Sequence, residues 1–275
     1  MKKLLLGTLT WAALTGSAFA AEMAVRPMAA PAVSNWNGFY VGLNAGGGFQ
    51  SQEATLSGTD TGFAGILRPF GIPTLGPSIG VPMWVSGPLG GFTVGYNWQA
   101  GWWLAGIEAD IDCANITGIS NLTTPGVIPG FVPVTVGVVN TLDRFGTVRA
   151  RLGVLAGSNF LLFGTGGLAY GRNTLELSLL CPTCGPPANL YTQDRATKTG
   201  WTAGGGVEWN FLANWTVKAE YLYADLGSQT TPTLTYAYGP FLSTATVANN
   251  DRYHIVRFGV NYIFGGLGKG VVASY

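Results

Sequence analysis

Residues 255–264 read IVRFGVNYIF, and an apolar or aromatic side chain recurs at every second position from Val256 to Phe264. Arg257 and Asn261 lie between these positions. Side chains of a β-strand point alternately to its two faces, so this period of two predicts a strand with one apolar and one polar face. About ten residues of such alternation, with aromatic residues near the ends, are typical of strands that cross a membrane.

The same pattern recurs in seven further segments of the chain. They cover residues 39–46, 92–98, 104–111, 145–153, 161–171, 201–209 and 215–225. The eight segments together predict an all-β fold, an eight-stranded antiparallel transmembrane up-and-down β-barrel. Shorter alternating stretches predict extensions of the barrel hairpins past the membrane, and a barrel of ten strands is the alternative. These stretches are residues 134–138, 175–179 and 233–236.

The connections between the segments alternate in length. Short connections lie at residues 99–101, 157–159 and 210–214, whereas the other four run to tens of residues. Outer-membrane barrels have short periplasmic turns and long extracellular loops. We therefore expect both ends of the barrel to lie on the periplasmic side, which agrees with an even number of strands.

The composition is unlike that of a water-soluble domain. Charged residues make up 10% of the chain, which also contains 42 glycines, and the mean hydropathy is +0.29. Ordinary globular chains have about 25% charged residues, because their surfaces face water. The formal net charge of +1, without a basic stripe, argues against a nucleic-acid partner.

The N-terminus has the features of an export signal. Lys2 and Lys3 precede a short apolar run, which ends in the small-x-small cleavage site Ala18-Phe19-Ala20. We therefore predict a bacterial outer-membrane protein with four parts. They are a signal peptide (1–20), a periplasmic lead-in (21–35), the barrel (36–264) and a C-terminal tail (265–275).

The few charged residues in the segments alternate with apolar ones, so they share the inner face. On the outer face, Arg or Lys would cost about 2–4 kcal/mol at the membrane midplane. We predict that four acids and four bases form an ion-pair network that fills the lumen, which is narrow in an eight-stranded barrel. They are Glu108, Asp110, Arg149, Arg151, Glu208, Lys218, Glu220 and Arg257. Acid–base catalysis by paired carboxylates is the alternative, but the balanced charges favour a structural role.

Cysteine and histidine provide weak motifs. Cys181 and Cys184 form a CxxC motif, but redox chemistry would require a βαβ context and a zinc site would require four ligands. We expect a loop disulfide or two thiols there, Cys113 as the odd cysteine, and no metal or cofactor. The single histidine, His254, is expected at a strand end near the surface, with haem ligation as the alternative.

Several blocks in the predicted strands resemble a known family. They read NGFYVGLNAG (37–46), GYNWQ (95–99), GIEAD (106–110), GTVRARLG (146–153), GGLAYG (166–171), GWTAG (200–204), KAEYLY (218–223) and VRFGVNY (256–262). Together they resemble the alphaproteobacterial outer-membrane immunogenic protein family, small porin-family barrels of rhizobia and Brucella that are similar to opacity proteins. The resemblance covers about residues 36–264. It implies an eight-stranded outer-membrane barrel, a surface antigen and a contributor to envelope integrity, and no enzyme.

The chain departs from the family in two places. Phe264 would be the terminal aromatic residue that the barrel assembly machinery reads, but residues 265–275 follow it, so either Tyr275 substitutes for it or the tail is spare. Residues 63–85, in the first long loop, are unusually apolar and contain four prolines. We therefore do not transfer loop functions from the family to this chain.

These observations predict a structural and surface-antigen role in the envelope. A small diffusion pore is one alternative. The other is a surface binding protein whose loops hold an apolar ligand, haemin or a protein partner, because exposed apolar patches usually mark contact sites. The expected partners are outer-membrane lipid and lipopolysaccharide, together with the barrel assembly machinery.

Overall fold

The structure, a computed structural model, describes residues 35–60, 78–123, 135–180, 189–238 and 241–264. The predicted signal peptide, the periplasmic lead-in before residue 35 and the C-terminal tail lie outside the described residues, as do Cys181 and Cys184. Among the described residues, no helix is both long and apolar enough to cross a membrane.

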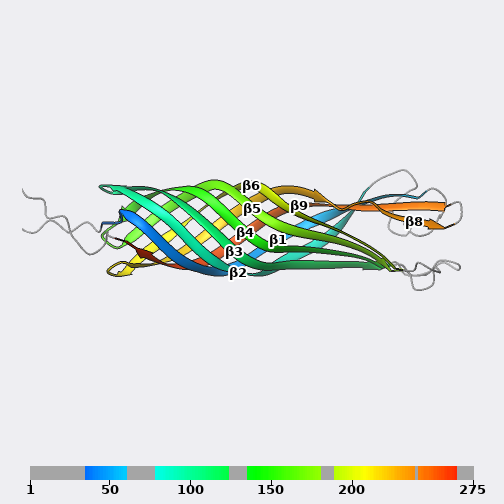
Figure 1. Cartoon of the computed structure of the whole chain (residues 1–275), viewed down its shortest axis with the longest axis horizontal. Helices are drawn as coiled ribbons and strands as arrows, with labels where there is room; N and C mark the ends of the chain where they lie inside the picture. Colours follow the sequence, from blue (N-terminus) through cyan, green and yellow to red (C-terminus); the bar gives the residue numbers. More distant parts are fainter. Residues whose placement is uncertain (1–34, 61–77, 124–134, 181–188, 239–240, 265–275) are drawn as a thin grey trace, which may run out of the picture. The chain divides into compact units, whose positions relative to one another are not determined.

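The described residues form nine strands. They are β1 (Gly38–Asp60), β2 (Ile79–Ala100), β3 (Trp103–Thr123), β4 (Thr135–Ala156), β5 (Phe160–Leu180), β6 (Asn189–Leu212), β7 (Trp215–Thr230), β8 (Leu234–Tyr238) and β9 (Phe241–Ile263). Eight of them close into a ring in the order β1 to β7 and then β9, and every neighbouring pair is antiparallel. The ring closes where β1 pairs with β9, for example Leu43 with Val260. Figure 1 shows these strands coiling side by side around one axis.

The ring confirms the eight-stranded barrel and excludes the ten-stranded alternative. The alternating stretches near residues 134–138 and 175–179 continue β4 and β5. The stretch at residues 233–236 contributes to β8, which among the described strands pairs only with β9 and adds a short hairpin outside the ring. The short connections are tight turns, and two of them contain glycines with positive φ, Gly101 (62°) and Gly157 (72°).

The strands are much longer than the sequence pattern predicted. The ring strands contain 16 to 24 residues, whereas about 9–11 residues suffice to cross a membrane. Each strand therefore continues well beyond the membrane at the end opposite the short turns. In β2, for example, the predicted loop residues from Ile79 to Val85 are part of the strand.

The polarity of the two faces inverts along the strands, and this inversion explains the underestimated lengths. In β1, Leu43 points outward and is 58% exposed, whereas its neighbour Asn44 is buried inside. Further along the same strand, Glu53 points outward, while Ala54 and Leu56 are buried inside. The inner face is thus polar within the membrane and apolar outside it, because the outer face meets first lipid and then water.

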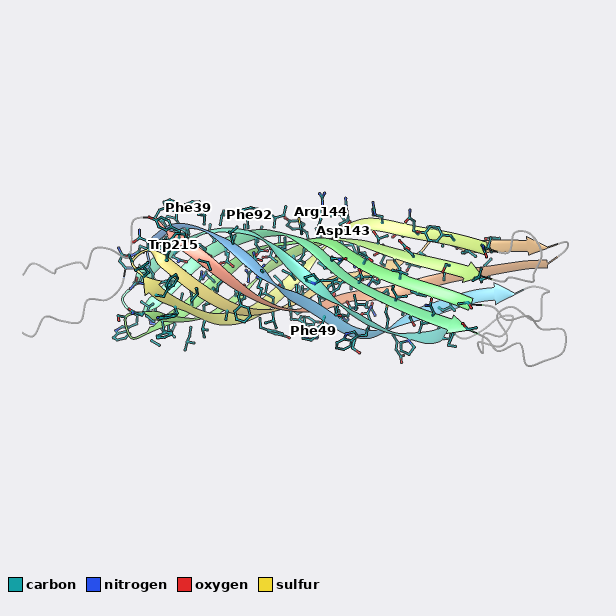
Figure 2. All side chains as sticks on the ribbon, turned by 90° about the horizontal axis from the view of Figure 1, so that it is seen from below. Phe39, Phe49, Phe92, Asp143, Arg144 and Trp215 are labelled. Atoms are coloured by element: carbon teal, nitrogen blue, oxygen red, sulfur yellow. The ribbon has the colours of Figure 1, made fainter. Side chains whose placement is uncertain are left out.

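Aromatic side chains mark the limits of the membrane band on the outer face. Near the short turns they include Phe39 and Trp215, and at the opposite limit they include Phe49 and Trp84; Figure 2 labels three of these residues. Aromatic girdles at both interfaces are typical of outer-membrane barrels. No described residue on the outer face between the two girdles carries a charge.

The interior contains three layers. A small apolar cluster that includes Trp36, Leu104 and Leu161 lies nearest the short turns, and the buried charged and polar side chains lie above it. An apolar core fills the half farther from the short turns, and it includes Val81, Met83 and Val85. These three residues were expected in an exposed apolar loop, but they are buried because they occupy the inner face of β2.

Candidate functional site

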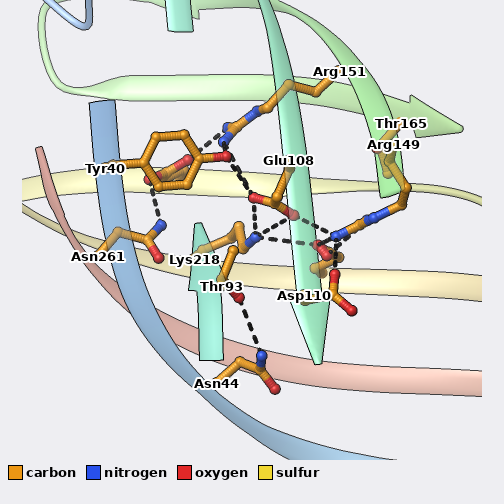
Figure 3. Close-up of polar contacts among 12 residues, drawn as sticks. Tyr40, Asn44, Thr93, Glu108, Asp110, Arg149, Arg151, Thr165, Lys218 and Asn261 are labelled. Carbon is orange, nitrogen blue, oxygen red and sulfur yellow. Dashed lines mark hydrogen bonds and ion pairs between the residues drawn. The ribbon is translucent and has the colours of Figure 1, made fainter. Parts of the chain in front are cut away.

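The structure places all eight predicted lumen charges inside the barrel and in contact with one another. They come from five strands, β3, β4, β6, β7 and β9, and each is at most 5% exposed. The period of two directs them inward, because their strand neighbours point to lipid. Figure 3 shows the centre of this network, with Glu108 between Arg149, Arg151 and Lys218.

Arg149 is one hub of the network. Its guanidinium pairs with Glu108, the residue directly opposite on β3. It also pairs with Asp110 at 3.1 Å and with Glu220 of β7 at 3.1 Å. Thr147 of the same strand accepts a hydrogen bond from the Arg149 Nε at 2.8 Å. All these side chains are buried, so one arginine joins strands that lie on different sides of the barrel.

Arg257 of β9 is the second hub. It pairs with Asp110 at 2.7 Å and with Glu220 at 3.2 Å, so it shares both carboxylates with Arg149. Its other nitrogen binds Asp112 at 2.9 Å. Shared carboxylates connect the two guanidinium groups into one continuous cluster across the lumen.

The remaining charges extend the cluster towards the short turns. Arg151 pairs with Glu208 of β6 at 2.6 Å. Lys218 pairs with Glu108 at 2.7 Å and with Glu220 at 3.3 Å. Tyr40 connects the groups, because its hydroxyl donates to Glu108 at 2.7 Å and accepts from Arg151 at 3.1 Å.

Packing fits these long side chains into the narrow lumen. The Arg151 guanidinium lies over the Phe163 ring, 4.4 Å from its centroid, in a cation–π contact. The Tyr40 ring lies directly against Gly95 of β2, where any Cβ would collide with it. Position 95 therefore requires glycine, because the Tyr40 ring occupies the space that a larger side chain would need.

The sequence prediction missed Asp112 and Tyr40. The predicted third strand ended at Ile111, but β3 continues to Thr123, and Asp112 is the next inward residue after Asp110. Extending the alternation by one residue would have found it. The inner cluster then has five acids and four bases, a formal charge of −1. The acids are Glu108, Asp110, Asp112, Glu208 and Glu220, and the bases are Arg149, Arg151, Lys218 and Arg257.

An apolar layer begins directly above the charged cluster. Phe145 of β4 pairs with Asp112 of β3, and it is fully buried together with Leu142 and Ile116. Farther along the barrel, Lys198 pairs with the buried Asp251 at 3.1 Å. Within the described residues, the ion pairs thus lie between two apolar clusters, one near the short turns and one beyond the membrane band.

This arrangement suits mechanical stabilisation better than chemistry. Each carboxylate of the cluster is held by at least one arginine or lysine, and the pairs are shielded from bulk water. The described residues contain no group of three or more His, Cys, Asp or Glu side chains placed to hold a metal ion. A general acid or base must reach a proton of its substrate, whereas these carboxylates are almost fully buried and contact arginine or lysine.

His254 and Cys113 lie outside the cluster, on the outer face. The His254 Nδ1 lies 2.6 Å from the Tyr221 hydroxyl, and its ring stacks on Phe49 with centroids 5.4 Å apart. The histidine is thus part of the girdle opposite the short turns. Cys113 is exposed and has no disulfide partner among the described residues.

Comparisons with known proteins agree with this architecture. The profile of the family described as "Outer membrane protein beta-barrel domain" matches residues 12–264. The 31 kDa outer-membrane immunogenic protein of Brucella melitensis biotype 1 is 33% identical over 275 residues, which cover 96% of this chain and 100% of that protein. The 22 kDa outer membrane protein of Rhizobium leguminosarum bv. viciae is 30% identical over 135 residues, 49% of this chain and 51% of that protein.

A similar solved structure is that of the outer membrane protein OprG from Pseudomonas aeruginosa. It aligns with 85% of this chain and with 100% of its own, at 12% identity and a TM-score of 0.42. The nearly full-length match to the Brucella protein and the matching family profile confirm the resemblance in the strand blocks. The chain therefore belongs to the outer-membrane β-barrel domain family, as a relative of the 31 kDa outer-membrane immunogenic proteins of Brucella.

Proposed function

We propose that this protein is a closed structural barrel that stabilises the outer membrane and displays its extended hairpins at the cell surface. The observation that carries the proposal is the filled lumen. Buried ion pairs centred on Arg149 and Arg257 occupy the membrane part, and the apolar core around Phe145 occupies the part beyond it. A water-filled path would need gaps through both layers.

The long extracellular extension supports a role in display. Its strands continue past the membrane with buried apolar residues inside, as in the core of a soluble domain. Such a rigid platform holds the hairpin ends away from the lipid surface, where antibodies or other cells can reach them. The name of the Brucella relative, an immunogenic protein, fits this kind of exposure.

A diffusion pore is the second candidate, because the strand blocks resemble those of porin-family barrels. The packing disfavours it: Arg149, Arg257 and Glu220 meet across the lumen, which is about as wide as their side chains require. Surface binding through the loops stays a further proposal. The hairpin ends that would carry it lie outside the described residues.

Conductance in planar bilayers tests the closed lumen. The protein, purified from outer membranes in its folded form, is expected to give no discrete openings at neutral pH. Folding is checked by the altered migration of the unheated barrel on a denaturing gel, and a known trimeric porin shows that the bilayer reports openings. Reproducible unitary steps at low protein concentration would refute the closed barrel and favour the pore.

The envelope role needs a test in cells. A strain that lacks the protein is expected to become more sensitive to detergent and to large antibiotics that an intact outer membrane excludes. Expression of the full chain should restore resistance. Unchanged sensitivity of the deletion strain would count against a contribution to envelope integrity, whether or not the lumen is closed.

A further inference from the structure

The charged residues on the outer face are confined to the region beyond the membrane band. On the described strands they are Glu53, Asp143, Arg144, Arg172, Glu176, Arg195, Asp225 and Arg252. Three arginines lie on the neighbouring strands β4, β5 and β6. We call Arg144, Arg172 and Arg195, with Asp143 between them, the arginine patch.

A β-bulge in β4 produces the patch. The register between β4 and β5 shifts between Leu142 and Arg144. Leu142 and Phe145 are both buried inside, so the two residues between them, Asp143 and Arg144, both point outward. Bulges redirect side chains in this way and are frequent at sheet edges, at barrel rims and next to functional sites.

The bulge places two arginines next to each other, and Asp143 of the bulge partly compensates their repulsion. Arg144 lies directly opposite Arg172 of β5, and like charges in this position repel each other. Asp143 holds Arg172 through three hydrogen bonds of 2.7 to 3.0 Å. These bonds lower the pKa of the Asp143 carboxyl, so it stays ionised and neutralises Arg172 at neutral pH.

Arg144 and Arg195 retain their positive charges on either side of this neutral pair. Both are exposed, and within the described part of the chain neither has an ion-pair partner within 4.0 Å. Arg195 only donates from its Nε to Thr174 at 3.1 Å, which orients the guanidinium along the surface of β5. Glu176 is the other acid on this face, so the patch and its surroundings carry a formal charge of +1.

The rest of the outer face has no such surplus. Asp225 and Arg252 neutralise each other in an ion pair of 3.1 Å. Glu53 of β1 carries the only other charge on the described outer face, and it is negative. Positive charge is therefore concentrated on the β4–β6 side of the barrel.

The patch lies at the level where the lipid head groups begin. On β5, Arg172 is the next outward residue after Tyr170, whose ring covers Gly146 of β4. Arg144 in turn is the next outward residue beyond Gly146. The patch lies on the side of the long connections, which faces the outer leaflet. Figure 2 shows Asp143 and Arg144 beyond Phe92 and on the far side from Trp215.

We propose that Arg144 and Arg195 bind the phosphate groups of lipopolysaccharide in the outer leaflet, with the Arg172–Asp143 pair holding them apart. Guanidinium groups suit phosphates, because their planar forks donate two parallel hydrogen bonds to two oxygens. Two exposed guanidinium groups on either side of the Arg172–Asp143 pair offer one fork to each phosphate of a lipid that carries two phosphates on a disaccharide. The inference depends on the outer-leaflet orientation but not on whether the lumen conducts.

Titration with defined lipids tests the site. The probes are lipid A with both phosphates, lipid A with the phosphates removed, and inorganic pyrophosphate, each added to the protein in detergent micelles. The wild type is expected to bind the bisphosphorylated lipid at least about tenfold more tightly than the dephosphorylated lipid. It should bind pyrophosphate more weakly still, because the acyl chains also contact the apolar outer face. Equal binding of both lipids, or pyrophosphate binding as tight as that of lipid A, would overturn the proposal.

Two variants locate the binding. Arg144→Gln/Arg195→Gln is expected to lose the preference for the phosphorylated lipid, whereas Arg252→Gln should retain it, because that arginine lies in a neutral pair. The variant Arg144→Lys/Arg195→Lys keeps the charges without the planar forks and should bind with intermediate affinity. A preference that survives in the double glutamine variant, or that Arg252→Gln abolishes equally, would refute the site. Neither result would bear on the conductance test of the closed barrel.

Discussion

At the residue scale, a few shared ion pairs determine how the barrel is held together. Arg149 contacts three carboxylates from two other strands, and Arg257 binds two of the same carboxylates from the other side. Buried charges of this kind are costly unless each has a partner with good geometry. The removal of Arg149 therefore leaves five buried acids facing three bases, although Lys218 and Arg257 still contact its three carboxylates.

Arg149→Leu is expected to lower the free energy of unfolding by about 3–5 kcal/mol, the usual cost of breaking a buried ion pair. The matched control is Arg252→Leu, which removes an arginine that is 58% exposed and paired with Asp225 on the surface. Its cost should be about 0–1 kcal/mol. Urea unfolding in lipid vesicles measures both values. Similar values for the two variants would contradict the structural importance of the network.

The sequence predicted these residues unequally well. All eight lumen charges followed from strict alternation. Charged side chains are excluded from the lipid-facing side of a strand, so they must point into the lumen. Asp112 escaped because its strand was taken to end one residue earlier, at Ile111. Tyr40 escaped because an aromatic residue in a barrel strand suggests the lipid-facing girdle. Its contact with Arg151 and Glu108 depends on the space that Gly95 leaves.

At the element scale, each strand serves two environments. The outer face of β3 shows this clearly, because Ile107 and Ile119 both point outward with exposures of 54% and 64%. Ile107 lies within the lipid band, whereas Ile119 lies on the part of the strand that extends into water. Identical residue types with similar exposure therefore experience different solvents.

Ile107→Arg is expected to destabilise the folded barrel by about 2–4 kcal/mol, because it places a charge in the lipid core. Ile119→Arg on the same strand should change the stability by less than about 0.5 kcal/mol, the usual effect at an exposed position. Unfolding titrations of both variants in the same vesicles measure the difference. Equal destabilisation would show that the membrane band is wrongly placed along β3.

This inversion also explains why strand lengths were underestimated from the sequence. A search for apolar residues on one face of a strand stops where the apolar residues move to the opposite face. The strand itself continues beyond that point. In β1, the break falls between Leu43 and Leu56, which lie on opposite faces. Residues beyond such a break resemble loops because their outward positions are polar.

At the scale of the whole molecule, the closed lumen that we propose rests on the ion-pair cluster in the membrane part and on the apolar core in the part beyond it. Tests of the closed lumen can therefore address one layer at a time. A defect in one layer should leave the other layer intact.

Arg151→Ala in the charged layer and Leu142→Ala in the apolar layer are each expected to remain silent in planar bilayers. Each variant opens space in one layer only, and the other layer still blocks the path for ions. The recordings are compared with those of the wild type after the folding check by gel migration. Unitary conductance steps from either folded variant would show that one layer alone keeps the barrel closed.

Local patterns in the chain were sufficient for the fold class, the eight membrane segments, the inward direction of the charges and the family. Alternation depends only on the pleat of a strand and on the lipid around it, so it can be read without knowing any distant contact. Closure of β1 on β9, the bulge at Asp143 and the continuation of the strands into an apolar extracellular core depend on pairing between segments far apart in the chain. Only the three-dimensional structure resolved these features, because the packing of all eight strands, rather than any single one, sets which face is buried beyond the membrane.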